Sequence, residues 1–202
     1  MDQKSLLEAG RRLLDPLVAV LADSGVRPAA VTVLGLAITF LASVLVWSGD
    51  LFFAAVLLSL GSVLDAADGA LARRLRMESA SGAVLDSTAD RLGEALVFIG
   101  IIAGETARIQ PVLLYLAPAA LCGSFAVSYV RARAEGVGIE CRVGVFARTE
   151  RLLVTIFGLA LAGLWDERIL PVAVGILALG SFVTASHRLW HVHRSSGKAP
   201  GS

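Results

Sequence analysis

The chain alternates between long apolar stretches and short polar segments. Each apolar stretch is close to the ~20 residues that an α-helix needs to cross the hydrocarbon core of a bilayer. The stretches fall at residues 30–49, 51–73, 80–104, 111–134, 149–165 and 169–190. The pattern predicts an all-α integral membrane protein with six transmembrane helices. An even number of spans places both ends of the chain on the same side of the membrane.

The first 29 residues have a different pattern, in which apolar and charged side chains divide between two faces of a helix over residues 4–22. One face carries Leu6, Leu13, Leu17 and Val20, and the other carries Glu8, Arg11, Arg12 and Asp15. Such a helix is expected to rest in the membrane interface, with a kink at Pro16. The predicted organisation is an interfacial amphipathic helix in 1–29, a six-helix membrane domain over 30–190 and a cytoplasmic tail over 191–202.

Composition and charge agree with this membrane topology. Hydrophobic residues make up 56% of the 202 residues, which excludes a water-soluble globular domain. Positive charge gathers in 1–29, 74–79, 135–148 and the C-terminal tail, whereas the opposite loops offer only Arg108 and Arg168. By the positive-inside rule, both termini and the turn between the second and third spans face the cytoplasm. We expect a multi-pass plasma-membrane protein with lipid partners and no nucleic acid partner.

Four aspartates lie close to the cytoplasmic ends of the second and third predicted spans. Asp65 and Asp68 share one helix face, and Asp86 and Asp90 share one face of the next helix. A short turn lets these helices run antiparallel, so the four carboxylates are expected to meet. They cannot all stay ionised near a low-dielectric region without cations between them. Oxygen ligands favour a hard metal ion, Mg²⁺ or Mn²⁺.

Glycine and arginine residues next to these aspartates indicate a phosphate-bearing ligand. Gly69 follows Asp68 directly, and Gly82 lies one helical turn before Asp86, so that a ligand or a neighbouring backbone can approach closely. Arg73 lies one turn beyond Gly69, where its guanidinium can reach a phosphate bidentately.

The segment from Asp65 to Asp90 resembles the signature of the CDP-alcohol phosphotransferases, D-x2-D-G-x2-A-R-x8-G-x3-D-x3-D. The resemblance implies a homodimer with two bound metal ions. It also implies transfer of a phosphatidyl group from a CDP-linked lipid, CDP-diacylglycerol, to an alcohol with release of CMP. The signature positions are Asp65, Asp68, Gly69, Ala72, Arg73, Gly82, Asp86 and Asp90.

The resemblance assigns roles to these residues. Asp65, Asp68, Asp86 and Asp90 would bind the metal ions, and Asp90 would also act as the general base for the attacking hydroxyl. The nucleotide donor would be bound by Thr32, Asp68, Gly69, Ala72, Arg73 and Gly82. One departure is Ala29, which follows Pro28 where the family often has Asn or Asp.

A second group of basic residues points to an anionic acceptor. Arg131 ends the fourth predicted span, and Arg148 and Arg151 begin the fifth. Three guanidiniums suit a dianionic phosphate better than a neutral polyol. With Ser128, the region is similar to family members that make phosphatidylinositol phosphate from inositol phosphate. It departs from them at Arg131, where Lys is common, and at Thr149, where Pro is common.

Three alternatives remain open at this stage. Glycerol 3-phosphate is also an anionic acceptor, and the arginines could serve membrane topology alone. A cation transporter that uses the aspartates belongs to a different class of protein. Transport sites usually lie near the bilayer midplane between repeats or broken helices, whereas these aspartates lie at one membrane edge and neither half of the chain resembles the other.

Overall fold

The computed structural model describes residues 14–196, and over this range the protein contains helices and no strands. A helix over residues 14–23 comes first. The helices that follow are α2 (Pro28–Ser48), α3 (Leu51–Leu75), α4 (Ala80–Ala103), α5 (Glu105–Ile109), α6 (Leu113–Gly136), α7 (Arg148–Leu164) and α8 (Ile169–Ser196). A helix thus occupies each predicted span. The short α5 was not predicted, and α8 continues beyond residue 190 into the segment predicted as a tail.

Four of these helices, α2, α3, α6 and α8, are long and apolar enough to cross a membrane. The protein is therefore an integral membrane protein. The other two long helices mix apolar and charged residues. α4 carries Asp86, Asp90, Arg91 and Glu94, and α7 has 17 residues and begins with Arg148. The count of six spans stays a prediction for these two helices.

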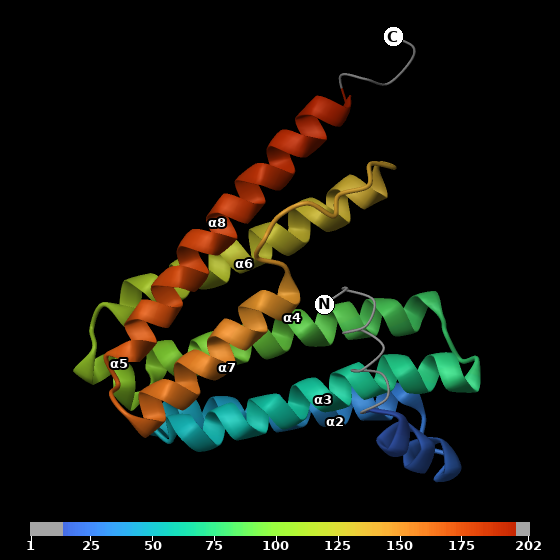
Figure 1. Ribbon diagram of the computed structural model, residues 1–202, viewed down its shortest axis with the longest axis horizontal. Helices are drawn as coiled ribbons and strands as arrows, with labels where there is room; N and C mark the ends of the chain where they lie inside the picture. Colours follow the sequence, from blue (N-terminus) through green and yellow to red (C-terminus); the bar gives the residue numbers. More distant parts are fainter. Residues whose placement is uncertain (1–13, 197–202) are drawn as a thin grey trace, which may run out of the picture.

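The N-terminal helix can be followed only in part, because residues 1–13 lie outside the described range. The helix over 14–23 lies beside the ends of α2 and α3 next to the α3–α4 turn (Figure 1). Its Val18 is buried in a small apolar cluster with Val31, Ala67 and Leu71. The cluster fixes residues 14–23 against the start of α2 and against the end of α3 that carries Asp65 and Asp68. The interfacial role of the whole segment stays a prediction.

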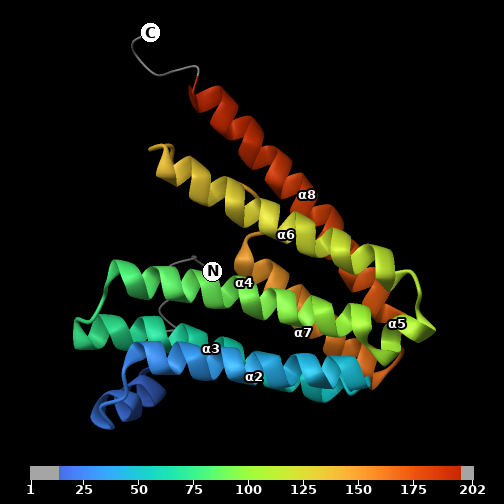
Figure 2. The same ribbon diagram turned by 180° about the vertical axis from the view of Figure 1, so that it is seen from behind.

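The long helices converge at one end of the molecule and separate toward the other. α2, α3 and α4 run side by side, while α6 and α8 pack together and diverge from them toward the chain's C-terminus (Figures 1 and 2). The main apolar core lies at the converging end and includes Leu51, Ile101, Leu113, Leu159 and Leu170. The aspartates lie toward the other end of α3 and α4, near the turn that joins these two helices.

Small residues let α2 approach both of its neighbours closely. A Cβ added to Gly61 of α3 would lie 2.9 Å from the Thr39 hydroxyl, and one added to Gly100 of α4 would lie 2.5 Å from the Ser43 carbonyl oxygen. Neither distance is tolerable for a carbon atom. Glycine at these positions is therefore a packing requirement between membrane helices.

The close approach of α4 to α2 predicts that Gly100→Ala destabilises the protein. The added methyl group meets a backbone carbonyl that cannot move without shifting α2, which we expect to cost about 1–3 kcal/mol in unfolding free energy. Thermal unfolding in detergent measures the effect. Gly136→Ala is the matched control, because nothing lies within 4 Å of the position of its Cβ. Equal stability of the two variants would contradict this account of the packing.

Candidate active site

Three of the four signature aspartates meet at the junction of α3 and α4. One carboxylate oxygen from each of Asp65, Asp68 and Asp86 lies within 4.8 Å of the others. Asp90 lies one turn farther along α4, and its side chain is 8% exposed. The antiparallel arrangement of α3 and α4 thus brings Asp86 to the carboxylates of α3, as the helical spacing predicts.

The turn between α3 and α4 sets this juxtaposition. α3 ends at Leu75, and Arg76 takes a left-handed backbone conformation with φ of 53°. α4 begins after Ser79, whose hydroxyl accepts a hydrogen bond of 3.1 Å from the backbone N–H of Gly82. This N-cap satisfies a free N–H of the first turn and fixes where α4 starts. The register of Asp86 against Asp65 follows from it.

The residues predicted to contact the donor lie on α2, α3 and the first turn of α4. Thr32 of α2 donates a 2.5 Å hydrogen bond to Asp68 Oδ2, and both side chains are buried. A Cβ on Gly69 would lie 3.5 Å from Arg73 Nη1, so the guanidinium of Arg73 rests beside the backbone that follows Asp68. Ala72, in the last turn of α3, is half-buried.

The grouped carboxylates fit a divalent cation. All three side chains offer oxygen, the donor atom that Mg²⁺ and Mn²⁺ take in proteins. Two of the aspartates come from α3 and one from α4, so both helices would hold the ion. Burial at the ends of apolar helices makes uncompensated negative charge costly, which favours occupation of the group by cations.

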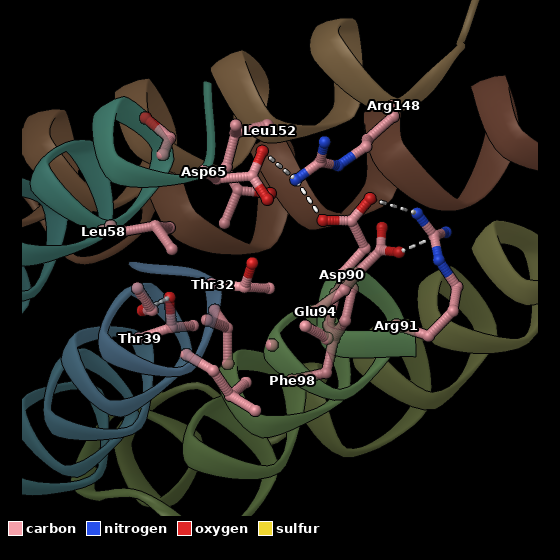
Figure 3. Close-up of a pocket in the computed structure, with 18 residues that line it drawn as sticks. Thr32, Thr39, Leu58, Asp65, Asp90, Arg91, Glu94, Phe98, Arg148 and Leu152 are labelled. Carbon is pink, nitrogen blue, oxygen red and sulfur yellow. Dashed lines mark hydrogen bonds and ion pairs between the residues drawn. The ribbon is translucent and has the colours of Figure 1, made fainter. Parts of the chain in front are cut away.

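Arg148, the first residue of α7, joins the two signature helices. Its Nη2 lies 2.7 Å from Asp65 Oδ2 and also pairs with Asp90 Oδ1. Figure 3 shows the guanidinium reaching both carboxylates. Arg148 was predicted to belong to the acceptor pocket, and its position places any anion that it holds directly beside the carboxylates.

Arg151 is engaged differently, because all of its nitrogen atoms contact protein acceptors. Nε and Nη2 lie 3.0 and 3.4 Å from the two carboxylate oxygens of Glu94, and Nη1 donates to the carbonyl oxygen of Phe146 at 3.2 Å. Its side chain is 3% exposed. Glu94 also accepts a hydrogen bond from Ser124 and pairs with Arg91 at 3.0 Å. Sequence reasoning missed Glu94 and Arg91, although charged residues in an apolar helix are a usable signal.

The two α6 residues predicted for the acceptor pocket have separate surroundings. Ser128 Oγ accepts a 2.5 Å hydrogen bond from Arg91 Nη1, which ties it to α4. Arg131 Nε pairs with Glu135 Oε1 at 2.8 Å, and both side chains are about half exposed. The structure therefore brings Ser128 to the charged network and leaves Arg131 on the surface of α6.

Helix α8 fixes the loop over residues 137–147 that leads into α7. Thr184 Oγ1 accepts a 3.1 Å hydrogen bond from the backbone N–H of Phe146. Buried Arg188 donates from Nε to the Val143 carbonyl at 2.9 Å and from Nη1 to the Val127 carbonyl at 2.8 Å. Because Phe146 lies two residues before Arg148, these contacts set the position of the α7 N-terminus. Sequence reasoning missed Arg188 too, although it is an arginine within the last apolar stretch.

A cavity extends from the charged groups into the apolar part of the bundle, between α2, α3, α4 and α7 (Figure 3). Its polar wall includes Thr32, Asp65, Asp90, Arg91 and Arg148. The apolar residues Leu58, Val97 and Phe98 lie about two helical turns deeper along α3 and α4. A molecule with an anionic head and an apolar portion matches this lining.

Comparison with known proteins decides the family, because residues 26–186 match the family model described as CDP-alcohol phosphatidyltransferase. The chain belongs to the CDP-alcohol phosphatidyltransferase family. It is therefore a transferase, as the resemblance at the aspartates predicted.

The archaetidylinositol phosphate synthase of Methanothermobacter thermautotrophicus is 38% identical, and the alignment covers 90% of this chain and 89% of that protein. The phosphatidylinositol phosphate synthase of Streptomyces avermitilis is 34% identical, over 93% and 81% respectively.

Solved structures of the phosphatidylinositol phosphate synthase of Mycobacterium tuberculosis have the same fold. The structure with CDP-DAG bound superposes with a TM-score of 0.83 at 30% sequence identity and covers 94% of this chain and 96% of that one. The complex with manganese and citrate gives a TM-score of 0.81 at 28% identity, covering 93% and 90%. A phosphatidyltransferase of this family is thus similar to the present chain over nearly its whole length.

The α8 contacts predict that Thr184→Val destabilises the loop that positions Arg148. Valine keeps the shape of threonine and removes the oxygen that accepts from Phe146, so a half-buried N–H loses its partner at a cost of about 1 kcal/mol. We expect a lower unfolding temperature in detergent and lower transferase activity. Thr184→Ser keeps the acceptor oxygen and should retain most of both. If valine were tolerated as well as serine, the hydrogen bond would not hold the loop.

Proposed function

We propose that this transferase moves a phosphatidyl group from CDP-diacylglycerol to the hydroxyl of an inositol phosphate, producing phosphatidylinositol phosphate and CMP. The observation that carries the proposal is the meeting of three carboxylates and Arg148 at the polar end of a cavity that continues into the membrane bundle. The names of the relatives described above support the same reaction.

The donor part of the proposal rests on the residues around the α3–α4 turn. The pocket for the nucleotide would be shaped by Thr32, Gly69, Ala72, Arg73 and Gly82. Asp68 belongs to the same pocket, because it accepts the Thr32 hydrogen bond and directly precedes Gly69. Arg73 supplies a positive charge for a phosphate, and its guanidinium already lies beside the Gly69 backbone. The CDP-DAG bound to the M. tuberculosis relative supports this donor.

We further propose that Asp65, Asp68, Asp86 and Asp90 bind two divalent ions, Mg²⁺ or Mn²⁺. When bound, such ions neutralise the pyrophosphate of the donor and the charge that develops on departing CMP. The manganese complex of the relative supports a divalent metal. Thr32 would hold Asp68 in place for this role through its hydrogen bond.

Asp90 is also proposed as the general base that takes the proton from the attacking hydroxyl. Its carboxylate lines the cavity and pairs with Arg148, so an acceptor bound to Arg148 would bring its hydroxyl toward Asp90. Proton removal in the transition state typically contributes 10²–10⁴-fold to a rate. The phosphate of the acceptor would be held by Arg148, which lines the cavity. Ser128, Arg131 and Arg151 were predicted for the same role, but Arg151 is fully engaged by Glu94 and Phe146, and Arg131 pairs with Glu135 on the surface.

The proposal includes a membrane topology and a homodimer. α4 and α7 would cross the membrane together with the four apolar helices, and both termini and the active site would face the cytoplasm of a plasma-membrane enzyme. The excess of Lys and Arg in the segments on that side supports this orientation. Two copies would form the homodimer that the family resemblance implies.

The test of the function is CMP release by the purified protein with CDP-diacylglycerol and Mg²⁺. Inositol 1-phosphate, glycerol 3-phosphate, serine and free inositol are compared as acceptors. Release that depends on inositol 1-phosphate supports the proposal. A preference for glycerol 3-phosphate would make the protein a phosphatidylglycerophosphate synthase, and no CMP release with any of the four acceptors would contradict the proposal.

The role of Asp90 predicts that Asp90→Asn lowers kcat by about 10²-fold or more, because the amide cannot accept the hydroxyl proton. Asp166→Asn is the control, since Asp166 is exposed in the loop between α7 and α8. Steady-state rates at saturating donor and acceptor measure the change. Near-normal turnover of Asp90→Asn would remove Asp90 as the base.

A further inference from the structure

We propose that Arg91 binds the phosphate of the acceptor together with Arg148, and that Glu94 holds Arg91 in place for this purpose. This inference rests on the proposed transfer to a phosphorylated alcohol. It adds to the acceptor pocket a residue that the signature and the basic segments of the sequence do not indicate. It also gives Arg151 a different role, the support of Glu94.

Arg151 is poorly placed to meet a substrate. Each of its nitrogen atoms is engaged by Glu94 or by the Phe146 carbonyl, and its side chain is 3% exposed. Arg151 is also absent from the residues that line the cavity. A phosphate could recruit this guanidinium only by separating a buried ion pair, and removal of one partner from such a pair is costly.

Arg91 and Arg148 both line the cavity, and they lie on the two sides of Asp90. Arg148 pairs with Asp90 Oδ1, whereas Arg91 Nη2 lies 4.0 Å from Asp90 Oδ2. Figure 3 shows the Asp90 carboxylate between the two guanidiniums. An anion held by both arginines would therefore lie next to the proposed base. This arrangement suits an acceptor whose phosphate and attacking hydroxyl belong to one small molecule.

Glu94 orients Arg91 and leaves part of its guanidinium available. Both hydrogen bonds of Arg91 in the described structure use Nη1, one to Glu94 Oε2 at 3.0 Å and one to Ser128 Oγ at 2.5 Å. The side chain is 25% exposed. An arginine that is already held loses little conformational freedom when it binds a ligand, which favours affinity. Glu94 also offsets the repulsion between Arg91 and Arg151, which share it as a partner.

A purely structural role for Arg91 makes different predictions. Its bond to Ser128 joins α4 to α6, and loss of such a link would lower the unfolding temperature and affect both substrates. A phosphate-binding role affects the acceptor selectively. The distinction therefore requires KM for each substrate separately, together with stability.

The experiment compares wild type, Arg91→Gln and Arg91→Lys in CMP release, with KM measured for inositol 1-phosphate and for CDP-diacylglycerol. We expect Arg91→Gln to raise the KM for inositol 1-phosphate about tenfold or more, as loss of a charge-assisted hydrogen bond does, with the KM for CDP-diacylglycerol within about twofold. Arg91→Lys keeps the charge without the planar fork. Its KM for inositol 1-phosphate should lie between those of wild type and Arg91→Gln. Arg133→Gln, which removes an exposed arginine from α6, is the control for charge alone.

Two results would overturn the inference: an unchanged acceptor KM in Arg91→Gln, or a parallel rise of both KM values with a lower unfolding temperature. If Arg91→Gln does not fold, Arg91→Lys decides by the same two KM values.

Failure of the proposed function looks different, because wild type itself would then not use inositol 1-phosphate. Should wild type use glycerol 3-phosphate instead, the same comparison with that acceptor tests Arg91. Use of unphosphorylated acceptors alone would overturn both proposals.

Discussion

The structure depends on compensation of the carboxylates that lie at the ends of α3 and α4. Asp65, Asp68 and Asp86 come together at the ends of apolar helices, with Asp68 buried and the other two half-buried, and Asp90 adds a fourth acid one turn away. Such a group is stable only with cations close by. Arg148 supplies one positive charge by pairing with Asp65 and Asp90, and the oxygen donor set fits a divalent cation as a further partner.

The rest of the fold holds Arg148 and its neighbours in position. Tight packing of α2 against α3 and α4 fixes the acids, and the apolar core holds the helices together at the opposite end. α8 holds the loop before α7 through Thr184 and Arg188. The network around Glu94 then links α4, α6 and α7. Charged groups from α3, α4 and α7 thus face one cavity.

Local periodicity explains which features the sequence could predict. The six long helices follow from apolar stretches of spanning length, and the pairing of Asp65 and Asp68 with Asp86 follows from helical spacing and a short turn. Four helices long and apolar enough to cross a membrane confirm the membrane character, and the match to the family model confirms the transferase family. α5 escaped prediction because a helix of five residues carries little periodic signal.

Long-range contacts explain what the sequence could not predict. The full engagement of Arg151 depends on Glu94, which lies 57 residues away on another helix, and the Arg91–Ser128 bond joins residues 37 apart. Thr184 and Arg188 matter because α8 folds back on the loop before α7. A sequence pattern indicates that a charge is present in an apolar helix, but only the tertiary arrangement indicates its partner.

The most direct test of the central claim is Mn²⁺ binding by the purified protein, followed by electron paramagnetic resonance without substrates. If α3 and α4 together form the cation site, Asp86→Asn should weaken Mn²⁺ binding by about tenfold or more, because a coordinating carboxylate becomes a neutral amide. Asp166→Asn, in the loop between α7 and α8, should bind Mn²⁺ as wild type does. Equal Mn²⁺ affinity of wild type and Asp86→Asn would contradict the account.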